Sequence, residues 1–274
     1  MSGIVFGCIA PHPPLLVPSI GRGQESAVQK TGDAMEKLAN LLAQQHPDAA
    51  VLISPHAESS PDAMGILTAP ACTGDLQKWG DRSPAFTFAN DIELVSLIRK
   101  EAQSSGIPTR SIGISSYALD HGAMVPLHFL MRSLQQVPII PIAFSWLPLK
   151  THYVFGKAIE KAAKQRQKRV AIIASGDLSH RLLPQGPYGY EPMGPIFDKR
   201  LVDDLSKLDV KDILNMDDDL IERAGQCGLR SFVILLGALD GLKVKPTILS
   251  YEGPFGVGYM VATFEIQQGE RRNE

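Results

Sequence analysis

The sequence has few cysteines, little net charge and no long apolar run, and each of these features excludes a class of protein. Its three cysteines, Cys8, Cys72 and Cys227, are odd in number and widely spaced, which argues against a disulfide framework and for a reducing compartment. A net charge of −2 gives no electrostatic basis for binding nucleic acid or an anionic membrane surface. No apolar run is long enough to cross a bilayer, and the first residues lack a basic leader followed by a small-residue cleavage site. We therefore expect a cytoplasmic protein that acts on a small molecule.

Length and composition favour one folded domain. The chain has 274 residues, of which 44% are hydrophobic and 20% charged, and this is enough to bury a substantial core. The sequence contains no internal repeat, low-complexity segment or linker. These observations predict a single domain over residues 1–268, followed by a polar tail over residues 269–274.

Short apolar runs alternate with segments of helical periodicity, which is typical of the α/β class. Strands are predicted over residues 4–10, 48–54, 63–69, 137–145, 169–175, 243–251 and 256–266, and helices over residues 21–45, 91–104, 123–136, 151–166, 196–207, 211–216 and 229–239. We expect a single-domain, three-layer sandwich in which helices flank a mostly parallel or mixed central sheet. Residues 71–89 are predicted to be irregular and to form a lid or pocket wall, and residues 184–195 to form a loop.

Four of the seven histidines follow apolar strands or lie in loops that contain glycine or proline. His12 and His56 each come directly after a proline that ends a strand, and His180 closes the segment Gly-Asp-Leu-Ser-His after another strand. His121 precedes a glycine and a helix. Because ligands bind beyond the carboxyl ends of strands in open α/β sheets, we expect these imidazoles and Asp177 to gather at one rim. The alternative for the segment that ends at His180 is a helix N-cap followed by a surface histidine.

The remaining polar residues that could carry chemistry have simpler explanations. His46 lies at a helix end, and His128 and His152 lie within helical stretches, so all three are predicted to be structural. The three aspartates at 217–219 are acidic enough for a metal site. Carboxylates also favour the positive end of a helix dipole, and we therefore predict that a helix starts there.

Four segments, in order along the chain, resemble one known family. The segments are Ala10-Pro-His-Pro-Pro14, Ser54-Pro-His56, Leu119-Asp-His-Gly122 and Ser175-Gly-Asp-Leu-Ser-His180. Together they are similar to motifs in the B-type catalytic chains of the class III extradiol ring-cleavage dioxygenases, including the Memo-like branch of that superfamily. The resemblance extends from the first strand to the helix after Cys227. It implies that residues 1–268 form an extradiol dioxygenase or Memo-like metal-binding domain.

The resemblance also implies a role for each matched residue. His12 and His56 correspond to the two metal-binding histidines of the family. His180 corresponds to the catalytic acid and base, with Asp177 close by and orienting it. His121 corresponds to the pocket histidine that contacts a substrate oxygen.

The third metal ligand is where this chain departs from the dioxygenases. Their ligand is a glutamate in an Ala-Gly-x-Glu-Gly-type segment, and the matching segment here is Ala-Gly-Gln-Cys-Gly over residues 224–228. Cys227 therefore stands in the place of the carboxylate, as in Memo-like proteins. Gln226 and Glu252 are the alternatives, and Cys227 could instead be a small buried hydrophobe at a helix start.

These assignments predict an Fe(II)-dependent extradiol dioxygenase that cleaves a catechol-type ring with O2, with Zn or Cu as alternative metals. Its partners would be a small aromatic diol and O2, with neither nucleic acid nor membrane, and the chain would form a homo-oligomer or act with a partner subunit or domain. The first rival is a Memo-like metal-binding protein with a redox or modification role and no ring cleavage. The second is a Zn-dependent hydrolase, because histidines, a thiol and a carboxylate can also activate water.

Overall fold

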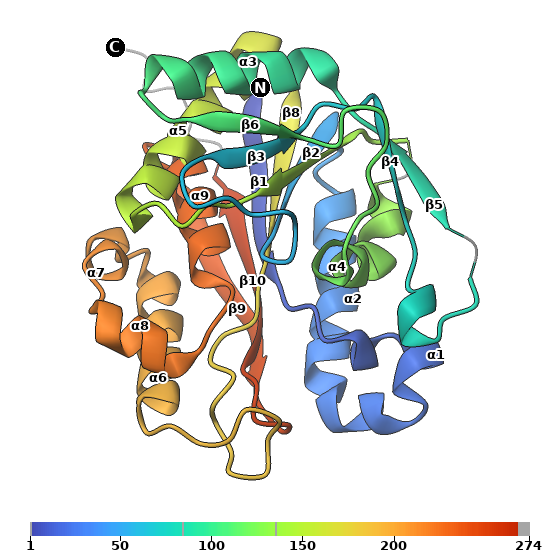
Figure 1. Ribbon diagram of the computed structural model, residues 1–274, viewed down its shortest axis with the longest axis vertical. Coiled ribbons are helices and arrows are strands. Elements are labelled where there is room, and N and C mark those ends of the chain that lie inside the picture. Colours follow the sequence, from blue (N-terminus) through green and yellow to red (C-terminus); the bar gives the residue numbers. More distant parts are fainter. Residues whose placement is uncertain (1, 84, 135, 268–274) are drawn as a thin grey trace.

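The structure is a computed structural model that describes residues 2–83, 85–134 and 136–267 (Figure 1). Its centre is an eight-stranded sheet with the strand order β6-β3-β7-β2-β8-β1-β10-β9. The strands of this sheet are β1 (Gly3–Ala10), β2 (Ala49–Ser54), β3 (Met64–Leu67), β6 (Thr109–Ile112), β7 (Ile139–Ala143), β8 (Arg169–Ser175), β9 (Val244–Glu252) and β10 (Tyr259–Ile266). The helices are α1 (Pro18–Gly21), α2 (Gln29–Ala43), α3 (Ile92–Ser104), α4 (His121–Leu130), α5 (Leu149–Arg166), α6 (Met193–Lys207), α7 (Val210–Leu214), α8 (Asp218–Ala224) and α9 (Leu229–Ala238).

The sheet is mixed, and its core strands are parallel. Strands β7, β2, β8 and β1 run parallel to one another, whereas β10 is antiparallel to β1 and β3 is antiparallel to β7. Successive side chains of a strand enter different halves of the core: Val51 and Ile53 belong to one apolar cluster and Leu52 to the other. A strand that is buried on both faces must be apolar throughout, which is why β2 and β8 are near-continuous apolar runs.

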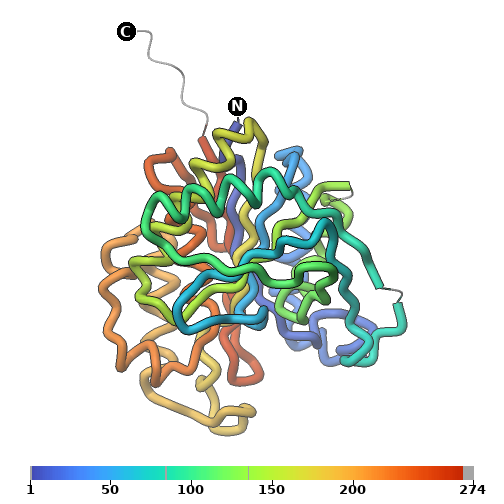
Figure 2. Tube along the Cα trace, turned by 45° about the horizontal axis from the view of Figure 1, so that its top comes forward, coloured from blue at the N-terminus to red at the C-terminus, as the bar shows by residue number. Residues whose placement is uncertain are grey.

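Helices cover both faces of the sheet, so the expected three-layer α/β architecture is confirmed. Helices α3, α5 and α9 pack together on one face, and α2 and α4 cover the other. Figures 1 and 2 both place α6, α7 and α8, in orange, on the opposite side of the molecule from the blue α2. Within the described part of the chain, no helix is both long and apolar enough to cross a membrane. The predicted tail over residues 269–274 lies outside the described residues, and the domain boundary at 268 stays a prediction.

Three parallel strands end at the same level, and this register positions the candidate site. Strand β8 lies between β2 and β1, with Ala10 paired with Ser175 and Ile53 paired with Ala174. The predicted β-α-β unit of β1 and β2 therefore has another strand inserted between its two strands. A residue two positions beyond any of these three ends lies beside its counterparts on the neighbouring strands.

Some local predictions were wrong. Residues 71–89 are not irregular but contain a two-stranded hairpin, β4 (Ala71–Gly74) with β5 (Phe86–Ala89). Strand β6 was not predicted, because its four residues are short and mostly polar and it pairs only at the edge of the sheet. The helix start expected at the aspartates is confirmed, since the side chain of Asp217 accepts hydrogen bonds from two backbone N–H groups of α8.

Candidate metal centre

Two histidines and an aspartate follow the ends of three neighbouring strands, which lie at the same level. His12, His56 and Asp177 each lie two residues beyond the end of β1, β2 and β8, respectively. The backbone N–H of His12 donates to Oδ1 of Asp177 at 3.0 Å, which ties the first strand end to the central one. His12 and Asp177 are buried, whereas His56 is exposed. The expected convergence of these side chains at one rim of the sheet is therefore present.

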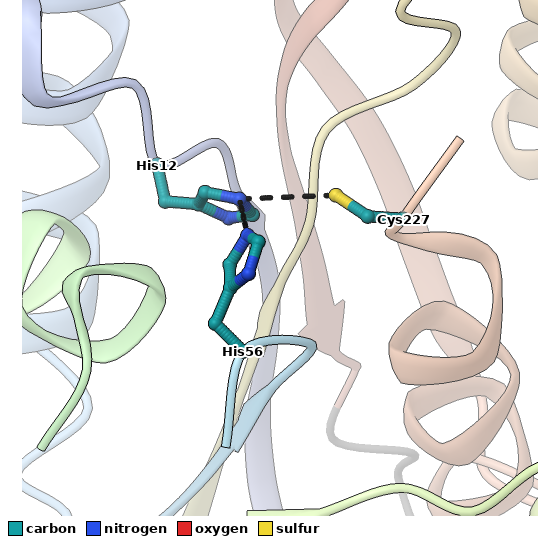
Figure 3. A group of neighbouring side chains, drawn as sticks. All are labelled: His12, His56 and Cys227. Carbon is teal, nitrogen blue, oxygen red and sulfur yellow. Dashed lines mark hydrogen bonds between the residues drawn. The ribbon is translucent and has the colours of Figure 1, made fainter. Parts of the chain in front are cut away.

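The ring nitrogens of the two histidines and one thiol lie close together (Figure 3). Nε2 of His12 is 3.0 Å from Nε2 of His56 and 3.7 Å from Sγ of Cys227. All three candidate ligand atoms lie within 4.8 Å of one another. Metal–nitrogen bonds of about 2.1 Å that meet at a right angle separate two nitrogens by about 3.0 Å, and a metal–sulfur bond of about 2.3 Å accounts for a longer N–S separation. The donor set therefore fits a first-row transition metal.

Ser175 fixes the tautomer of His12. Its hydroxyl donates to the carbonyl oxygen of Gly122, and it therefore accepts from Nδ1–H of His12 at 2.9 Å. This carbonyl needs a donor from outside its helix, because its partner one turn on would be Pro126, which has no N–H. With the proton on Nδ1, the lone pair of Nε2 faces His56 and Cys227, as a metal ligand requires.

Two glycines let the loop before α9 approach the end of β8. A Cβ on Gly176 would lie 2.2 Å from the Cα of Gly228, so this close backbone contact tolerates no side chain. Across the contact, the N–H of Gly228 donates to the carbonyl of Asp177 at 3.0 Å, and the N–H of Asp177 donates to Sγ of Cys227 at 3.3 Å. These contacts place the thiol of Cys227 next to His12, although the two residues are far apart in the sequence.

Burial keeps the imidazoles neutral and the thiol protonated. Burial, with the nearby His56, His121 and His180, holds the pKa of His12 well below its usual value. Although His56 is exposed, the surrounding protein partly desolvates its ring and lowers its pKa, and Asp120 opposes this shift. Burial raises the pKa of the Cys227 thiol well above its usual value, and Asp177 adds to the shift. Neutral imidazoles are ready to bind a cation, whereas the thiol would release its proton on binding one.

His121 lies against His56 and borders a cavity. Its ring centroid lies 4.2 Å from that of His56 and 5.1 Å from that of Trp79, which comes from the turn between β4 and β5. A cavity of about 430 Å³ lies between this turn and the start of α4, with Trp79 and His121 in its wall. Asp120 caps α4 by accepting from the N–H of Ala123. This cap fixes the position of His121, the first residue of the helix. The expected pocket wall is thus present, although a hairpin forms it.

His180 has an unpartnered ring nitrogen near the same thiol, among the described residues. The candidate ligand atoms of Asp177, His180 and Cys227 lie within 4.8 Å of one another. Burial lowers the pKa of His180 to about 4, and its buried Nε2 has no hydrogen-bond partner among the described residues. Burial also raises the pKa of Asp177 to about 7. Asp177 accepts from the backbone of His12 rather than from the ring of His180, so the expected orientation of His180 by Asp177 is not seen. Instead, the ring of Tyr188 lies 5.1 Å from that of His180.

The two alternative third ligands make contacts elsewhere. Oε1 of Gln226 accepts from the N–H of Leu229 at 2.8 Å at the start of α9. Oε1 of Glu252 accepts from the N–H and the hydroxyl of Thr31 at 2.8 and 2.6 Å. Among the described residues, Glu252 belongs to no cluster of candidate metal ligands, and the amide oxygen of Gln226 is already occupied by a backbone N–H. The structure thus favours Cys227 over both.

Four features of the site were not found from the sequence. The contact of Trp79 with His121 has no signal in the sequence, because it depends on the hairpin. Ser175 belonged to a recognised segment, but its role depends on the neighbouring helix. Gly176 and Gly228 were visible only as turn residues. Each of these contacts joins segments that are distant along the chain.

Comparison with known proteins agrees with the resemblance. The family described as the catalytic LigB subunit of aromatic ring-opening dioxygenase matches residues 7–262. The chain belongs to this family. Protein CA_C1420 of Clostridium acetobutylicum is 37% identical over 264 residues, which cover 94% of this chain and 56% of that protein.

Three further similarities cover different shares of their proteins. The 3,4-dihydroxyphenylacetate 2,3-dioxygenase of Escherichia coli is 28% identical over 58% of this chain and 60% of its own length. The 2-aminophenol 1,6-dioxygenase beta subunit of a Pseudomonas species is 25% identical over 96% of this chain and 94% of its own length. The chain thus spans little more than half the length of the Clostridium and Escherichia relatives. The crystal structure of uncharacterized protein JW3007 from Escherichia coli K12 has the same fold, with a TM-score of 0.66, 16% identity, and coverage of 95% of this chain and 99% of that one.

Proposed function

We propose that this protein is an Fe(II)-dependent extradiol-type dioxygenase, which opens the ring of a catechol-like diol with O2. The observation that carries the proposal is the convergence of Nε2 of His12, Nε2 of His56 and Sγ of Cys227, with His121, which lies against His56, in the wall of a cavity. Membership of the LigB family and the dioxygenase names of several relatives support the same reaction class. The substrate itself is left open.

His12, His56 and Cys227 are the residues that would hold the metal. Bound there, Fe(II) would supply coordination positions and a path for electrons from the diol to O2. The protein contributes two neutral imidazoles, and Ser175 fixes the tautomer of His12. The choice of iron over zinc or copper belongs to the proposal, since two nitrogens and one sulfur suit all three metals.

The neighbouring side chains would handle the proton and the ring. His180 is neutral at neutral pH, so its unpartnered Nε2 can accept the proton of a substrate hydroxyl and return it later. His121 would donate a hydrogen bond to a substrate oxygen. Trp79 would form the apolar wall against which an aromatic ring lies.

Oxygen consumption tests this proposal. Protein loaded anaerobically with Fe(II) is mixed with a panel of catechols in an oxygen-electrode cell, and at least one diol should drive oxygen uptake. His180→Gln should lower the rate by about 10²- to 10⁴-fold, because it removes a general base. Its iron content should be unchanged, which separates proton transfer from metal binding. Absence of uptake with every diol by iron-loaded protein would contradict the proposal.

A second candidate function is metal binding without ring cleavage, as in a Memo-like protein with a redox or modification role. One observation favours it: a thiol occupies the position of the carboxylate of the dioxygenases. Cys227→Glu discriminates between the two functions. Ring cleavage by the natural chain supports the dioxygenase, whereas ring cleavage gained only by the variant supports the second candidate.

We further propose that the chain acts in the cytoplasm and assembles, either with copies of itself or with a partner subunit or domain. One relative is named a beta subunit, and the Clostridium relative extends well beyond the region that matches nearly all of this chain. Light scattering on the purified chain gives its mass in solution. A monomeric mass would exclude self-assembly.

A further inference from the structure

A second cavity, of about 600 Å³, lies away from the residues of the candidate metal centre. Its wall is formed by the loop from β7 to α5 together with α7, α8 and the first turn of α9. In Figure 1 these helices form the left side of the molecule, with α7 and α8 below the end of α9. None of the six candidate site residues belongs to this wall. The cavity is therefore a separate feature of the fold.

An arginine lies over the ring of a tryptophan in the wall of this cavity. The guanidinium carbon of Arg230 lies 4.8 Å from the ring centroid of Trp146 and 6.0 Å from that of Phe144. A guanidinium that lies over an aromatic ring keeps its N–H groups for hydrogen-bond acceptors. Trp146 is 59% exposed although it is a large aromatic residue, so it presents a wide apolar surface beside a fixed cation.

Arg230 has no anionic partner among the residues that the structure describes. In the parts of the chain that the structure describes, it forms no ion pair within 4.0 Å and no hydrogen bond, and its Nε is buried without an acceptor. Burial lowers the pKa of Arg230, and Asp218 opposes the shift only from a distance. A guanidinium remains charged under these conditions. A partly buried charge without a partner is unfavourable, and an anion that reached it would relieve that cost.

The other lining residues restrict the anion. Lys150 adds a second positive charge and Asp218 adds one negative charge, so the ionisable lining carries one net positive charge. This balance favours a monoanion over a multiply charged phosphate. Leu147, Pro148 and Ile221 also line the cavity, and they require an apolar part in the ligand.

We infer that this cavity binds an organic monocarboxylate. Its carboxylate accepts hydrogen bonds from the guanidinium edge of Arg230, and its flat apolar part lies on Trp146. Planar guanidinium and carboxylate groups match in a two-point geometry that an ammonium group does not offer. The inference does not rest on the proposed ring cleavage, because the cavity shares no residue with that site.

Benzoate serves as the probe, and Trp146 serves as the reporter. The chain has two tryptophans, so Trp79→Phe leaves Trp146 as the only one. Benzoate is titrated into this variant, as purified, while the tryptophan fluorescence is recorded. The same titration is repeated with Arg230→Gln, with Arg230→Lys, and with Arg99→Gln as the matched control. Arg99 is an exposed helix residue that lines a different cavity.

The inference predicts saturable quenching by benzoate. Arg230→Gln should raise the Kd about tenfold or more, Arg230→Lys should raise it by a smaller factor, and Arg99→Gln should leave it unchanged. Thermal melting identifies any variant that fails to fold. If Arg230→Gln fails to fold, the Kd of Arg230→Lys, which retains the charge, is compared with that of the parent protein. An unchanged Kd in both Arg230 variants, or the absence of saturable quenching, would overturn the inference. Inorganic phosphate that displaced benzoate at equal concentration would overturn the assigned ligand class.

Discussion

Replacing Ser175 with alanine should weaken metal binding by the histidine that this serine contacts. The Ser175 hydroxyl is fully buried, accepts from Nδ1–H of His12 and donates to the carbonyl of Gly122. Alanine leaves both of these groups buried without a partner. His12 can then place its proton on either nitrogen, and a proton on Nε2 blocks the atom that faces His56.

The size of the effect follows from these two contacts. A buried polar group that loses its partner costs about 1–3 kcal/mol, so two such groups predict a loss of about 2–6 kcal/mol in the free energy of unfolding. Loss of the partner that orients a metal-binding histidine lowers metal affinity by about 10- to 100-fold. Both effects are large enough to measure separately.

A matched serine controls for the general cost of an unpaired group. Ser179 is also fully buried and donates to the carbonyl of Ala224 at 2.9 Å, but it does not contact His12. Metal affinity is measured by competition with a chelator of known affinity, and stability by urea unfolding. Ser179→Ala should lower stability without changing metal affinity, whereas Ser175→Ala should lower both. Equal metal affinity in Ser175→Ala and the natural protein would refute this account of His12.

Three further predictions concern pH, backbone contact and substrate. Burial raises the pKa of Asp198 from its ordinary value of 3.8 to about 7, so the folded state binds a proton that the unfolded state lacks at intermediate pH. Stability should therefore fall as pH rises from about 4 to about 8, by at most about 4 kcal/mol, and urea unfolding of Asp198→Asn should show a flatter profile. Gly176→Ala should lower stability by about 1–3 kcal/mol and reduce metal content, because its Cβ would meet Gly228. Gly32→Ala, at an open helix position, should instead raise the melting temperature slightly. If iron-loaded protein cleaves a diol, Trp79→Ala should raise KM for that diol while iron content stays constant, and an unchanged KM would exclude Trp79 from the substrate wall.

The sequence predicts which residues lie at the rim of the sheet, because the topology of parallel strands decides where the strand ends lie. Apolar runs buried on both faces identify parallel strands, and parallel strands place their carboxyl ends together. The expectation that His12, His56 and Asp177 gather at one rim follows from this rule. The register that makes the three ends level is a property of the paired strands and could not be deduced from any single run.

Contacts between distant segments could not be predicted in the same way. From the sequence, Cys227, Gln226 and Glu252 were all candidates for the third ligand. The structure separates them because the two others bind Leu229 and Thr31, respectively. The hairpin that carries Trp79 was missed because each of its strands has only four residues and the two are separated by a long turn. Short edge elements give a weak periodic signal, and tertiary contacts decide their structure.

X-ray absorption at the metal edge tests most directly whether one ion is held by His12, His56 and Cys227. The purified protein is loaded with Fe(II) and compared with Cys227→Ala. The account predicts nitrogen scatterers at about 2.1 Å and one sulfur scatterer at about 2.3 Å, and it predicts that the variant loses the sulfur. A shell of nitrogen and oxygen alone, identical in the two proteins, would contradict it.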